Sequence, residues 1–458
     1  MAETFNKKKH DMKKPAALLL SLAMALPLAA CGGGATSTAD STATGDSATS
    51  ASTSGEGVTL RLVNGKIEVD AQLKELAELY KQETGVTVEI QSMGGGVDIQ
   101  SELKNYYQAD NMPDIFVNGS DADFNNWVGL LVDLSDQPWV SDTTQAYTDS
   151  EGAVLGFPYT TEAIGLAYNA DILEKAGVDP STLTTYSAYK DAFEKIDAMK
   201  DELGLTAVVD LGCEATNLYW SPGNHIFGQY LSAGLDRDDK TYIDLLSDGG
   251  QLDKERFTEF ANFFKLLIDY SDPTMAVSGT YDEQILQFAS GKYAFVTQGS
   301  WIGATMTSAD ADAYAAAGNF KVGLAPFAFS DKEPIETILT ASPSWWSIYN
   351  GSEHIEEAKA FLAWCAGDEA QKILVEEGGF ISPFASCTYV ASDPFAQTIA
   401  DYTAAGKTSA WDWMGMIEGV AQNCTGVLFQ QFAMGNLTVD QFVESMQTQL
   451  AAYYAENG

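Results

Sequence analysis

The alternation of apolar and polar positions in residues 58–117 predicts short strands separated by amphipathic helices. Apolar runs at residues 58–64, 86–90 and 115–117 have the length of buried strands. Between them, residues 69–83 and 99–107 repeat apolar side chains three and four positions apart, which is the spacing of one helix face. Strands that alternate with helices are typical of a parallel sheet covered by helices.

A second pattern of the same kind begins near residue 168. Helical spacing recurs in residues 186–199, 257–269 and 281–289, and strands are expected at residues 205–209, 293–297 and 320–325. One more strand is expected at residues 345–349, followed by helices to the end. The part of the chain beyond residue 57 has about 400 residues, a length that favours two domains or lobes.

The first 57 residues lack this periodicity and have the composition of a targeting segment. Lysines at positions 7–9 and 13–14 precede an apolar run over about residues 16–28, and Ala29 and Ala30 follow. This order is that of a secretory signal peptide, and the run is shorter than the about 20 residues of a membrane-spanning helix. Met12 begins a leader of the same kind, so the sequence does not distinguish Met1 from Met12 as the start.

Residues 28–31, Leu-Ala-Ala-Cys, resemble the lipobox of bacterial lipoproteins. The resemblance implies cleavage before Cys31 and acylation of this cysteine; the alternative is a secreted protein with a free Cys31. Residues 32–57 are mainly Gly, Ser, Thr and Ala, a composition that predicts a flexible linker. The expected organisation is a signal peptide over residues 1–30, a lipidated linker over residues 31–57 and a binding domain over residues 58–458.

The formal net charge of −39 argues against nucleic acid as a partner, because like charges repel. Beyond Cys31, the cysteines at positions 213, 365, 387 and 424 allow three full disulfide pairings and match no zinc pattern. The three histidines form no metal-ligand arrangement, and common enzyme and nucleotide-binding motifs are absent from the sequence. We therefore expect no metal, no cofactor and no catalytic residue.

The most specific motif is Phe-Ala-Ser-Gly-Lys-Tyr-Ala-Phe-Val-Thr-Gln-Gly-Ser-Trp at residues 288–301. It resembles the F-x-x-G-K-x-A-φ-x-x-x-G-x-W signature (φ apolar) of extracellular solute-binding proteins of sugar ABC transporters. Other segments resemble the same family in the same order: residues 113–115 (Pro-Asp-Ile), 156–159 (Gly-Phe-Pro-Tyr), 165–169 (Gly-Leu-Ala-Tyr-Asn), 358–371 and 378–383. The chain is similar to the family 1 type, which includes maltose- and oligosaccharide-binding proteins.

This resemblance implies a two-lobe α/β fold like that of periplasmic binding proteins, with hinge strands and a central ligand cleft. One lobe is expected to comprise residues 58–164 and 345–386, and the other residues 165–344 and 387–458. The implied function is to bind an oligosaccharide and deliver it to the permease subunits of an ABC transporter. We expect a monomer that performs no catalysis and is held by its lipid on the extracytoplasmic face of the cell membrane.

A sugar site needs flat aromatic side chains against the apolar ring faces and polar groups toward the hydroxyls. The aromatic candidates are Trp220, Trp301, Trp345, Trp346 and Trp413, with Trp411 as an alternative to Trp413. Consecutive strand residues point to opposite faces, so at most one of Trp345 and Trp346 faces a ligand easily. The family resemblance adds the polar candidates Lys66, Asn118, Asp121, Glu162, Glu214 and Tyr219. Trp127 and Trp364 lie on apolar helix faces and are expected in the core.

Two alternatives remain open at this point. A secreted lipoprotein rich in carboxylates can be a glycoside hydrolase, for which Glu162 and Glu214 are the pair to test. The same fold can also bind a polyamine or another small solute, since the chain is strongly acidic. The sequence does not identify the sugar, its linkage or its length.

Overall fold

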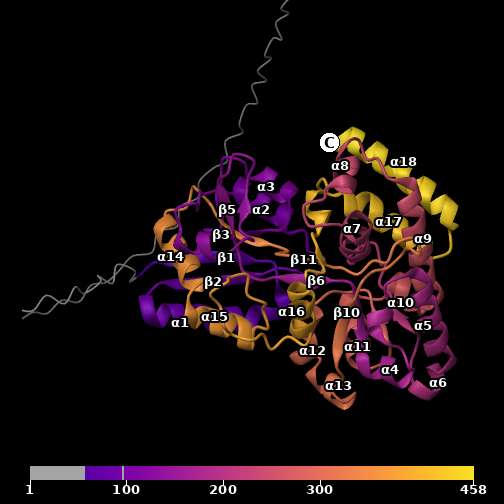
Figure 1. Cartoon of the computed structure of the whole chain (residues 1–458). Coiled ribbons are helices and arrows are strands. Elements are labelled where there is room, and N and C mark those ends of the chain that lie inside the picture. Colours follow the sequence, from indigo (N-terminus) through magenta and orange to yellow (C-terminus); the bar gives the residue numbers. More distant parts are fainter. Residues whose placement is uncertain (1–56, 95–96) are drawn as a thin grey trace, which may run out of the picture. The chain divides into compact units, whose positions relative to one another are not determined.

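The computed structural model describes residues 57–94 and 97–458, which fold into α/β elements around three sheets (Figure 1). The predictions for the signal peptide, for Cys31 and for nearly all of the linker lie outside these residues. Within the described ranges, no helix has the length and apolar character needed to cross a membrane.

The first sheet has six strands in the order β2-β1-β3-β12-β5-β4. They are β1 (Thr59–Asn64), β2 (Thr87–Ser92), β3 (Ile115–Asn118), β4 (Tyr147–Thr148), β5 (Val154–Pro158) and β12 (Trp345–Ile348). β1 is parallel to β2 and β3, as the sequence predicts, but β12 runs antiparallel to β3 and β5. The parallel pairing predicted for residues 58–117 is confirmed, and β12, which enters from a distant part of the chain, adds antiparallel pairs to the sheet.

Helices pack on this sheet and complete what we call lobe 1. Its α-helices are α1 (Asp70–Thr84), α2 (Ile99–Gln108), α3 (Asp121–Asn126), α14 (Ile355–Cys365) and α15 (Asp368–Lys372). Shorter 3₁₀ or π turns are η1 (Ile67–Val69), η2 (Pro138–Asp142) and η5 (Ile373–Glu377). α1 buries Leu73, Leu76, Ala77 and Tyr80, the apolar face that the helical spacing predicts.

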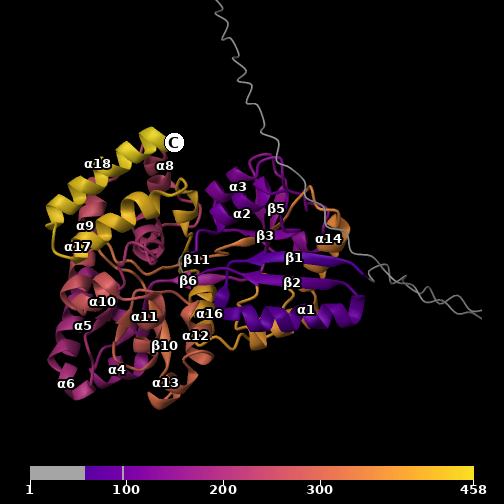
Figure 2. The same cartoon turned by 180° about the vertical axis from the view of Figure 1, so that it is seen from behind.

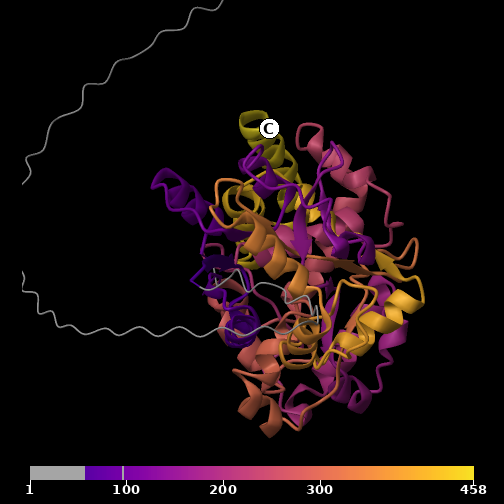
Figure 3. The ribbon, with the colours of Figure 1, turned by 90° about the vertical axis from the view of Figure 1, so that its left-hand side faces the viewer.

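One core in lobe 1 joins segments from the two ends of the domain. Leu60 and Leu76 pack in the same apolar cluster as Phe361, Phe380 and Phe384. Figure 3, viewed from the side of lobe 1, shows the indigo N-terminal segments beside the orange segments from residues near 360. Trp127 is buried and donates its indole N–H to Gln100, as expected for a core residue, whereas Trp364 is only partly buried.

The second sheet has four strands in the order β10-β7-β9-β8. They are β7 (Leu166–Asn169), β8 (Val209–Asp210), β9 (Phe295–Val296) and β10 (Val322–Ala325). β8 and β9 are much shorter than the strands that the apolar runs predict at residues 205–209 and 293–297. This sheet and the helices around it form lobe 2, whose core is rich in phenylalanine, including Phe257, Phe260 and Phe264 on one face of a single helix.

The helices of lobe 2 surround its small sheet (Figure 2). The α-helices are α4 (Ala170–Lys175), α5 (Tyr186–Ala198), α6 (Lys200–Leu203), α7 (Phe227–Ser232), α8 (Thr241–Ser247), α9 (Lys254–Asp269), α10 (Pro273–Ser278), α11 (Tyr281–Ala289), α12 (Ile302–Thr307), α13 (Ala311–Ala316), α16 (Ala396–Ala404), α17 (Gly426–Ala433) and α18 (Val439–Asn457). Shorter helical turns are η3 (Pro180–Thr182), η4 (Ser221–Ile226), η6 (Asp412–Gly415) and η7 (Ala421–Thr425), of which η4 and η7 are π-helical.

The third sheet, in the order β13-β11-β6, connects the two lobes. It contains β6 (Glu162–Ile164), β11 (Ile338–Ala341) and β13 (Thr408–Ser409), and β6 pairs antiparallel with β11. β6 lies between β5 of lobe 1 and β7 of lobe 2, and β11 leads into β12 of lobe 1 (Figure 1). Gly165 follows β6 at a point where an added Cβ would lie 2.2 Å from the carbonyl oxygen of Ala325, so glycine permits this close crossing.

The cysteines at positions 213, 365, 387 and 424 are free thiols, and all but Cys387 are buried. None of the three disulfide pairings that the sequence leaves open is formed among these residues. Burial raises the pKa of the Cys213 and Cys365 thiols well above the ordinary value, so these side chains act as small apolar groups.

Candidate functional site

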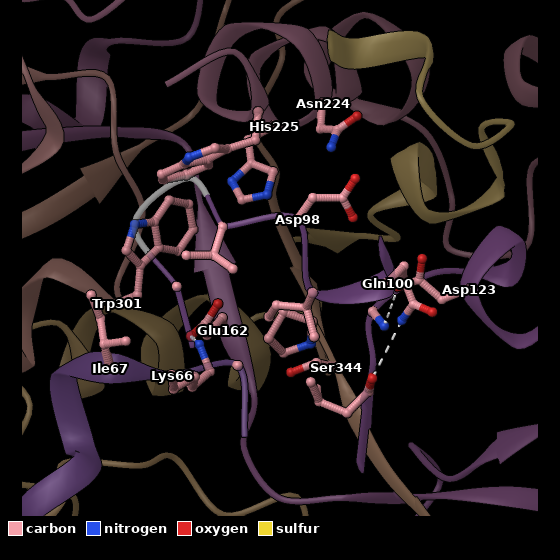
Figure 4. A pocket seen from close by; sticks show the side chains of 18 of the residues that line it. Lys66, Ile67, Asp98, Gln100, Asp123, Glu162, Asn224, His225, Trp301 and Ser344 are labelled. Atoms are coloured by element: carbon pink, nitrogen blue, oxygen red, sulfur yellow. Dashed lines mark hydrogen bonds and ion pairs between the residues drawn. The ribbon is translucent and has the colours of Figure 1, made fainter. Parts of the chain in front are cut away.

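A cavity of about 350 Å³ lies where loops of both lobes meet strand β6 (Figure 4). Lobe 1 contributes the segment that follows β1, the start of α2 and the segment that follows β3. Lobe 2 contributes η4, the start of α11, Trp301 and η6. The carboxyl ends of β1 and β3 point to this cavity, which is the usual position of ligands in open α/β sheets.

Aromatic side chains from lobe 2 form one wall of the cavity. Trp220, Trp301 and Trp413 line it together with Tyr219 and Tyr281. These residues come from four separate segments, so the aromatic wall exists only once lobe 2 has folded.

Trp301 is held firmly in this wall. Trp411 stacks against it with ring centroids 5.9 Å apart and an interplanar angle of 9°. The indole N–H of Trp301 donates to Oε1 of Gln298 at 3.1 Å. Gly299 leaves room for the indole, since a Cβ there would lie 2.1 Å from its ring and 2.5 Å from the carbonyl oxygen of Ala163. The last part of the G-x-W motif thus positions Trp301 against β6.

His225 lies in the middle of this wall, on the π-helix η4. Its ring centroid is 5.0 Å from that of Trp301, 4.8 Å from that of Trp411 and 5.2 Å from that of Trp413. Burial, and to a smaller extent the nearby charge of Lys66, lowers the pKa of His225 to about 3. The imidazole is therefore neutral near pH 7. Its buried Nδ1 has no hydrogen-bond partner within the described part of the chain.

Lys66 and Glu162 form a buried ion pair in the lining of the same cavity. Their side chains are 11% and 9% exposed, and the ammonium also lies 3.5 Å from Glu68. Burial alone would lower the pKa of Lys66, but the carboxylates of Glu162 and Glu68 raise it above the ordinary value. Burial raises the pKa of Glu162, and the ammonium of Lys66 opposes that shift. The pair joins the loop after β1 to the connecting strand β6.

Asp98 and Asp123 add two more carboxylates to the cavity lining. Asp123 accepts the backbone N–H of Gly119 at 2.8 Å, and burial raises the pKa of its carboxyl to about 6. Asp98 caps α2 by accepting the N–H and the hydroxyl of Ser101 at 3.0 and 2.7 Å. The lining therefore holds four carboxylates, at positions 68, 98, 123 and 162, and the one ammonium of Lys66.

A polar groove of about 590 Å³ continues the cavity toward the C-terminal helix. It shares Asp98, Asp123 and Trp413 with the cavity and extends along residues 416–423 to Tyr453 and Asn457 of α18. Lys104 of α2 contacts Glu418 across this region, with Nζ 2.7 Å from Oε1. Because the two share lining residues, the cavity and the groove form one continuous space.

Six of the predicted site residues line the cavity, and five do not. Those in the lining are Lys66, Glu162, Tyr219, Trp220, Trp301 and Trp413. Asn118 lies next to the cavity but is fully buried, donating to Ser347 at 3.0 Å and accepting from Gln100 at 3.3 Å. Asp121 is an exposed residue in the first turn of α3.

The other three predicted residues have structural contacts elsewhere. Trp346 stacks on Tyr159 in the core of lobe 1, with centroids 4.4 Å apart. Trp345 packs against Phe124 and donates its indole N–H to the carbonyl oxygen of Gln145 at 2.7 Å. Glu214 accepts the backbone N–H groups of Thr216 and Asn217 at 2.8 and 2.7 Å, which stabilises a turn. Glu214, the residue that the hydrolase alternative pairs with Glu162, therefore does not line the cavity.

Five further residues line the cavity although no motif in the sequence indicates them: His225, Tyr281, Glu68, Asp98 and Asp123. Asp98 precedes a predicted helix, but this is the pattern of an ordinary N-cap. His225 stands in a π-helix that packs against η7, about 200 residues further along the chain. No local pattern marks such a residue, because its position depends on that packing.

The chain belongs to the family of bacterial extracellular solute-binding proteins, whose model matches residues 75–406. The family predicted from the motifs is confirmed. No curated protein is matched by sequence.

Solved structures share the fold over nearly their whole length. A sugar transporter protein of Bacillus licheniformis in complex with stachyose has 20% identity and a TM-score of 0.67, covering 86% of this chain and 100% of that chain. The GacH receptor of Streptomyces glaucescens, studied unliganded and with acarbose, has 20% identity and a TM-score of 0.67, covering 87% and 99%. An ABC transporter solute-binding protein of Thermotoga lettingae bound with α-D-tagatose has 18% identity and a TM-score of 0.66, covering 87% and 100%. These likenesses confirm the predicted fold class.

Proposed function

We propose that this protein binds an oligosaccharide outside the cell and delivers it to the permease of an ABC transporter. The observation that carries the proposal is the aromatic platform of Trp301, backed by Trp411, which lines one cavity together with charged side chains. Membership of the solute-binding family and the sugars bound by the solved relatives support the same ligand class.

The aromatic and the polar side chains of the lining match the two kinds of surface of a pyranose ring. The C–H faces of the ring can stack on Trp301, with Trp220 and Trp413 beside it. The hydroxyl groups on the rim can donate to the carboxylates and to the acceptor nitrogen of His225, and can accept from Lys66. The groove that continues past Trp413 gives further rings a place to extend.

Binding then shifts an equilibrium between open and closed lobes. The aromatic wall belongs to lobe 2 and most carboxylates belong to lobe 1, so a ligand contacts both only when the lobes are close. We propose that residues 58–164 and 345–386 move against the rest of the domain, with β6 and β11 as hinge strands. The Lys104–Glu418 contact between the lobes would favour the closed arrangement.

The proposed place of work is the outer face of the cell membrane, with a lipid on Cys31 as the anchor. A linker of about 26 residues has a root-mean-square span of about 28 Å. It would hold the domain near its permease and raise the effective concentration for their contact. We propose that the protein acts as a monomer.

We also propose that the site performs no hydrolysis. The carboxylate of Glu162 is occupied by Lys66, and the other carboxylate proposed for a hydrolase, Glu214, is held by backbone N–H groups away from the cavity. Glu162 and Glu214 therefore do not form the pair of carboxyl groups that retaining and inverting glycosidases place on either side of the scissile bond.

The direct test is calorimetry of the fragment 58–458 with neutral oligosaccharides of increasing length, with chromatography of the sugars afterwards. We expect saturable binding and unchanged sugars. Recovery of shortened sugars would contradict the proposal, and so would the absence of binding across a broad glycan array.

A further inference from the structure

The cavity carries an uncompensated negative charge. Glu68 and Glu162 share the ammonium of Lys66, so the positive charge of this lysine is already satisfied. Asp98 and Asp123 line the same cavity, and no lysine or arginine besides Lys66 does so within the described residues. The hydroxyl groups of a neutral sugar can donate hydrogen bonds to these two carboxylates but cannot neutralise their charge.

The two aspartates lie beside the aromatic wall. In Figure 4, Asp98 lies between His225 on one side and Asp123 on the other. Tyr219 also lines the cavity, and its pKa is raised by burial and by the nearby charges of Asp98 and Asp123. A ring that stacks on Trp301 and extends toward Asp123 would therefore pass Asp98.

From this arrangement we propose that the ligand is a cationic amino sugar oligosaccharide, whose ammonium group binds at Asp98 and Asp123. The inference rests on the proposed function, because it assigns a chemical class to the sugar in that site.

The surroundings favour a cation in three ways. The neutral imidazole of His225 does not repel an ammonium group, and its buried Nδ1 is without a partner in the described part of the chain. Trp413 lines the cavity and the groove where they join, so its ring face can attract the same cation. Asp123 has acceptor capacity left, because the N–H of Gly119 and the hydroxyl of Ser120 use only part of what a carboxylate offers.

The charges that face Asp123 also favour a cation. Glu418 and Asp98, on two other elements, both raise the pKa of its carboxyl, and burial raises it most. Lys104 pairs with Glu418 and does not line the cavity. An ammonium group at Asp123 would relieve this repulsion and release a proton when the pH is near 6.

The test compares two sugars with the same skeleton, a β-1,4-linked N-acetylglucosamine oligomer and its fully de-N-acetylated form. We expect the cationic form to bind the fragment 58–458 at least tenfold more tightly at low salt, with a preference that shrinks as salt rises. At pH 6, calorimetry in two buffers of different ionisation enthalpy should show proton release on binding of the cationic form.

Variants then locate the preference. Asp123→Asn and Asp98→Asn keep the side-chain shape but should each reduce the preference at least fivefold, and Asp123→Asn should abolish the proton release. Glu75→Gln, which removes one exposed carboxylate on α1, is the matched control and should change neither quantity. Circular dichroism confirms that each variant is folded.

The outcomes separate this inference from the proposed function. The amino sugar inference is wrong if neutral sugars bind as tightly as the cationic form, or if Asp123→Asn keeps the full difference in affinity between the two forms. The proposed function stands in both cases. If no sugar binds in either form, the proposed function fails. If spermidine binds and sugars do not, the acidic cavity serves an acyclic polyamine, and both proposals are overturned.

Discussion

Replacing Lys66 by methionine tests how the buried ion pair stabilises the junction between lobe 1 and strand β6. Methionine keeps most of the apolar stem, so the change removes mainly the charge. Glu162, whose side chain is 9% exposed, is then a buried carboxyl without its cation. Removing one partner of a buried ion pair costs about 3–5 kcal/mol of the free energy of unfolding.

Protonation of Glu162 limits this loss and makes it depend on pH. The ordinary pKa of the side chain is 4.5, so keeping it neutral at pH 7 costs about 3.4 kcal/mol, at about 1.36 kcal/mol per pH unit. A carboxyl whose pKa is raised by folding binds more protons in the folded state, so stability falls as pH rises above the unfolded pKa. We therefore expect a loss of about 3 kcal/mol at pH 7 and below about 1 kcal/mol at pH 5.

Urea unfolding followed by tryptophan fluorescence at both pH values measures this difference. Lys74→Met is the control, because its pair with Asp70 has side chains 59% and 33% exposed and such pairs contribute about 0.2–1 kcal/mol. Adding Glu162→Gln to Lys66→Met should recover most of the lost stability at pH 7. A loss that is equal at pH 5 and pH 7, or smaller than that of the control, would refute this account of the pair.

Three further predictions concern the ligand, the core and the anchor. Trp301→Ala should weaken oligosaccharide binding about tenfold or more in calorimetry, since stacking contributes about 0.5–1.5 kcal/mol beyond the buried area, while Trp364→Ala should leave the Kd unchanged; equal affinities would contradict the platform assignment. Asp210 is fully buried, its carboxylate has no hydrogen-bond partner among the described residues, and burial raises its pKa well above the ordinary value. Asp210→Asn should therefore stabilise the fold against urea by about 1–4 kcal/mol at pH 7 and by less near pH 4, because the wild-type carboxyl must stay protonated as pH rises; destabilisation at pH 7 would show a partner for the charged form. Cys31→Ala should move the protein from the cell fraction to the medium with its sugar affinity intact; retention on cells, measured by immunoblot, would show that another element holds it.

Local periodicity was sufficient to predict the helices that have one strongly apolar face. α11 begins and ends at the residues that the spacing predicts, with Thr280 and Glu283 forming a capping box at its start. α9 begins three residues earlier than expected, since its first turn is polar and carries no apolar signal. Such elements depend on residues close together in the chain, which a sequence displays directly.

Strand order and strand length needed the whole fold. The apolar side chains at residues 205–209 are buried, but only Val209 and Asp210 form β8, because a strand requires a hydrogen-bonding neighbour and β9 is equally short. β12 lies between β3 and β5, which precede it by about 190 to 230 residues. No periodicity within a segment records which distant segment will pair with it.

The sequence by itself determined the family, the alternation of strands and helices, and the presence of tryptophans and acids suited to a sugar. Only the tertiary structure decided which of them meet. Trp301 faces the cavity because Gly299 and Trp411 hold it there, whereas Trp346 faces the core of lobe 1 because β12 is covered by helices on that side. Packing between distant segments also places His225, Asp98 and Asp123 in one cavity. A binding site depends on the distances between such segments, and only the packed fold sets these distances.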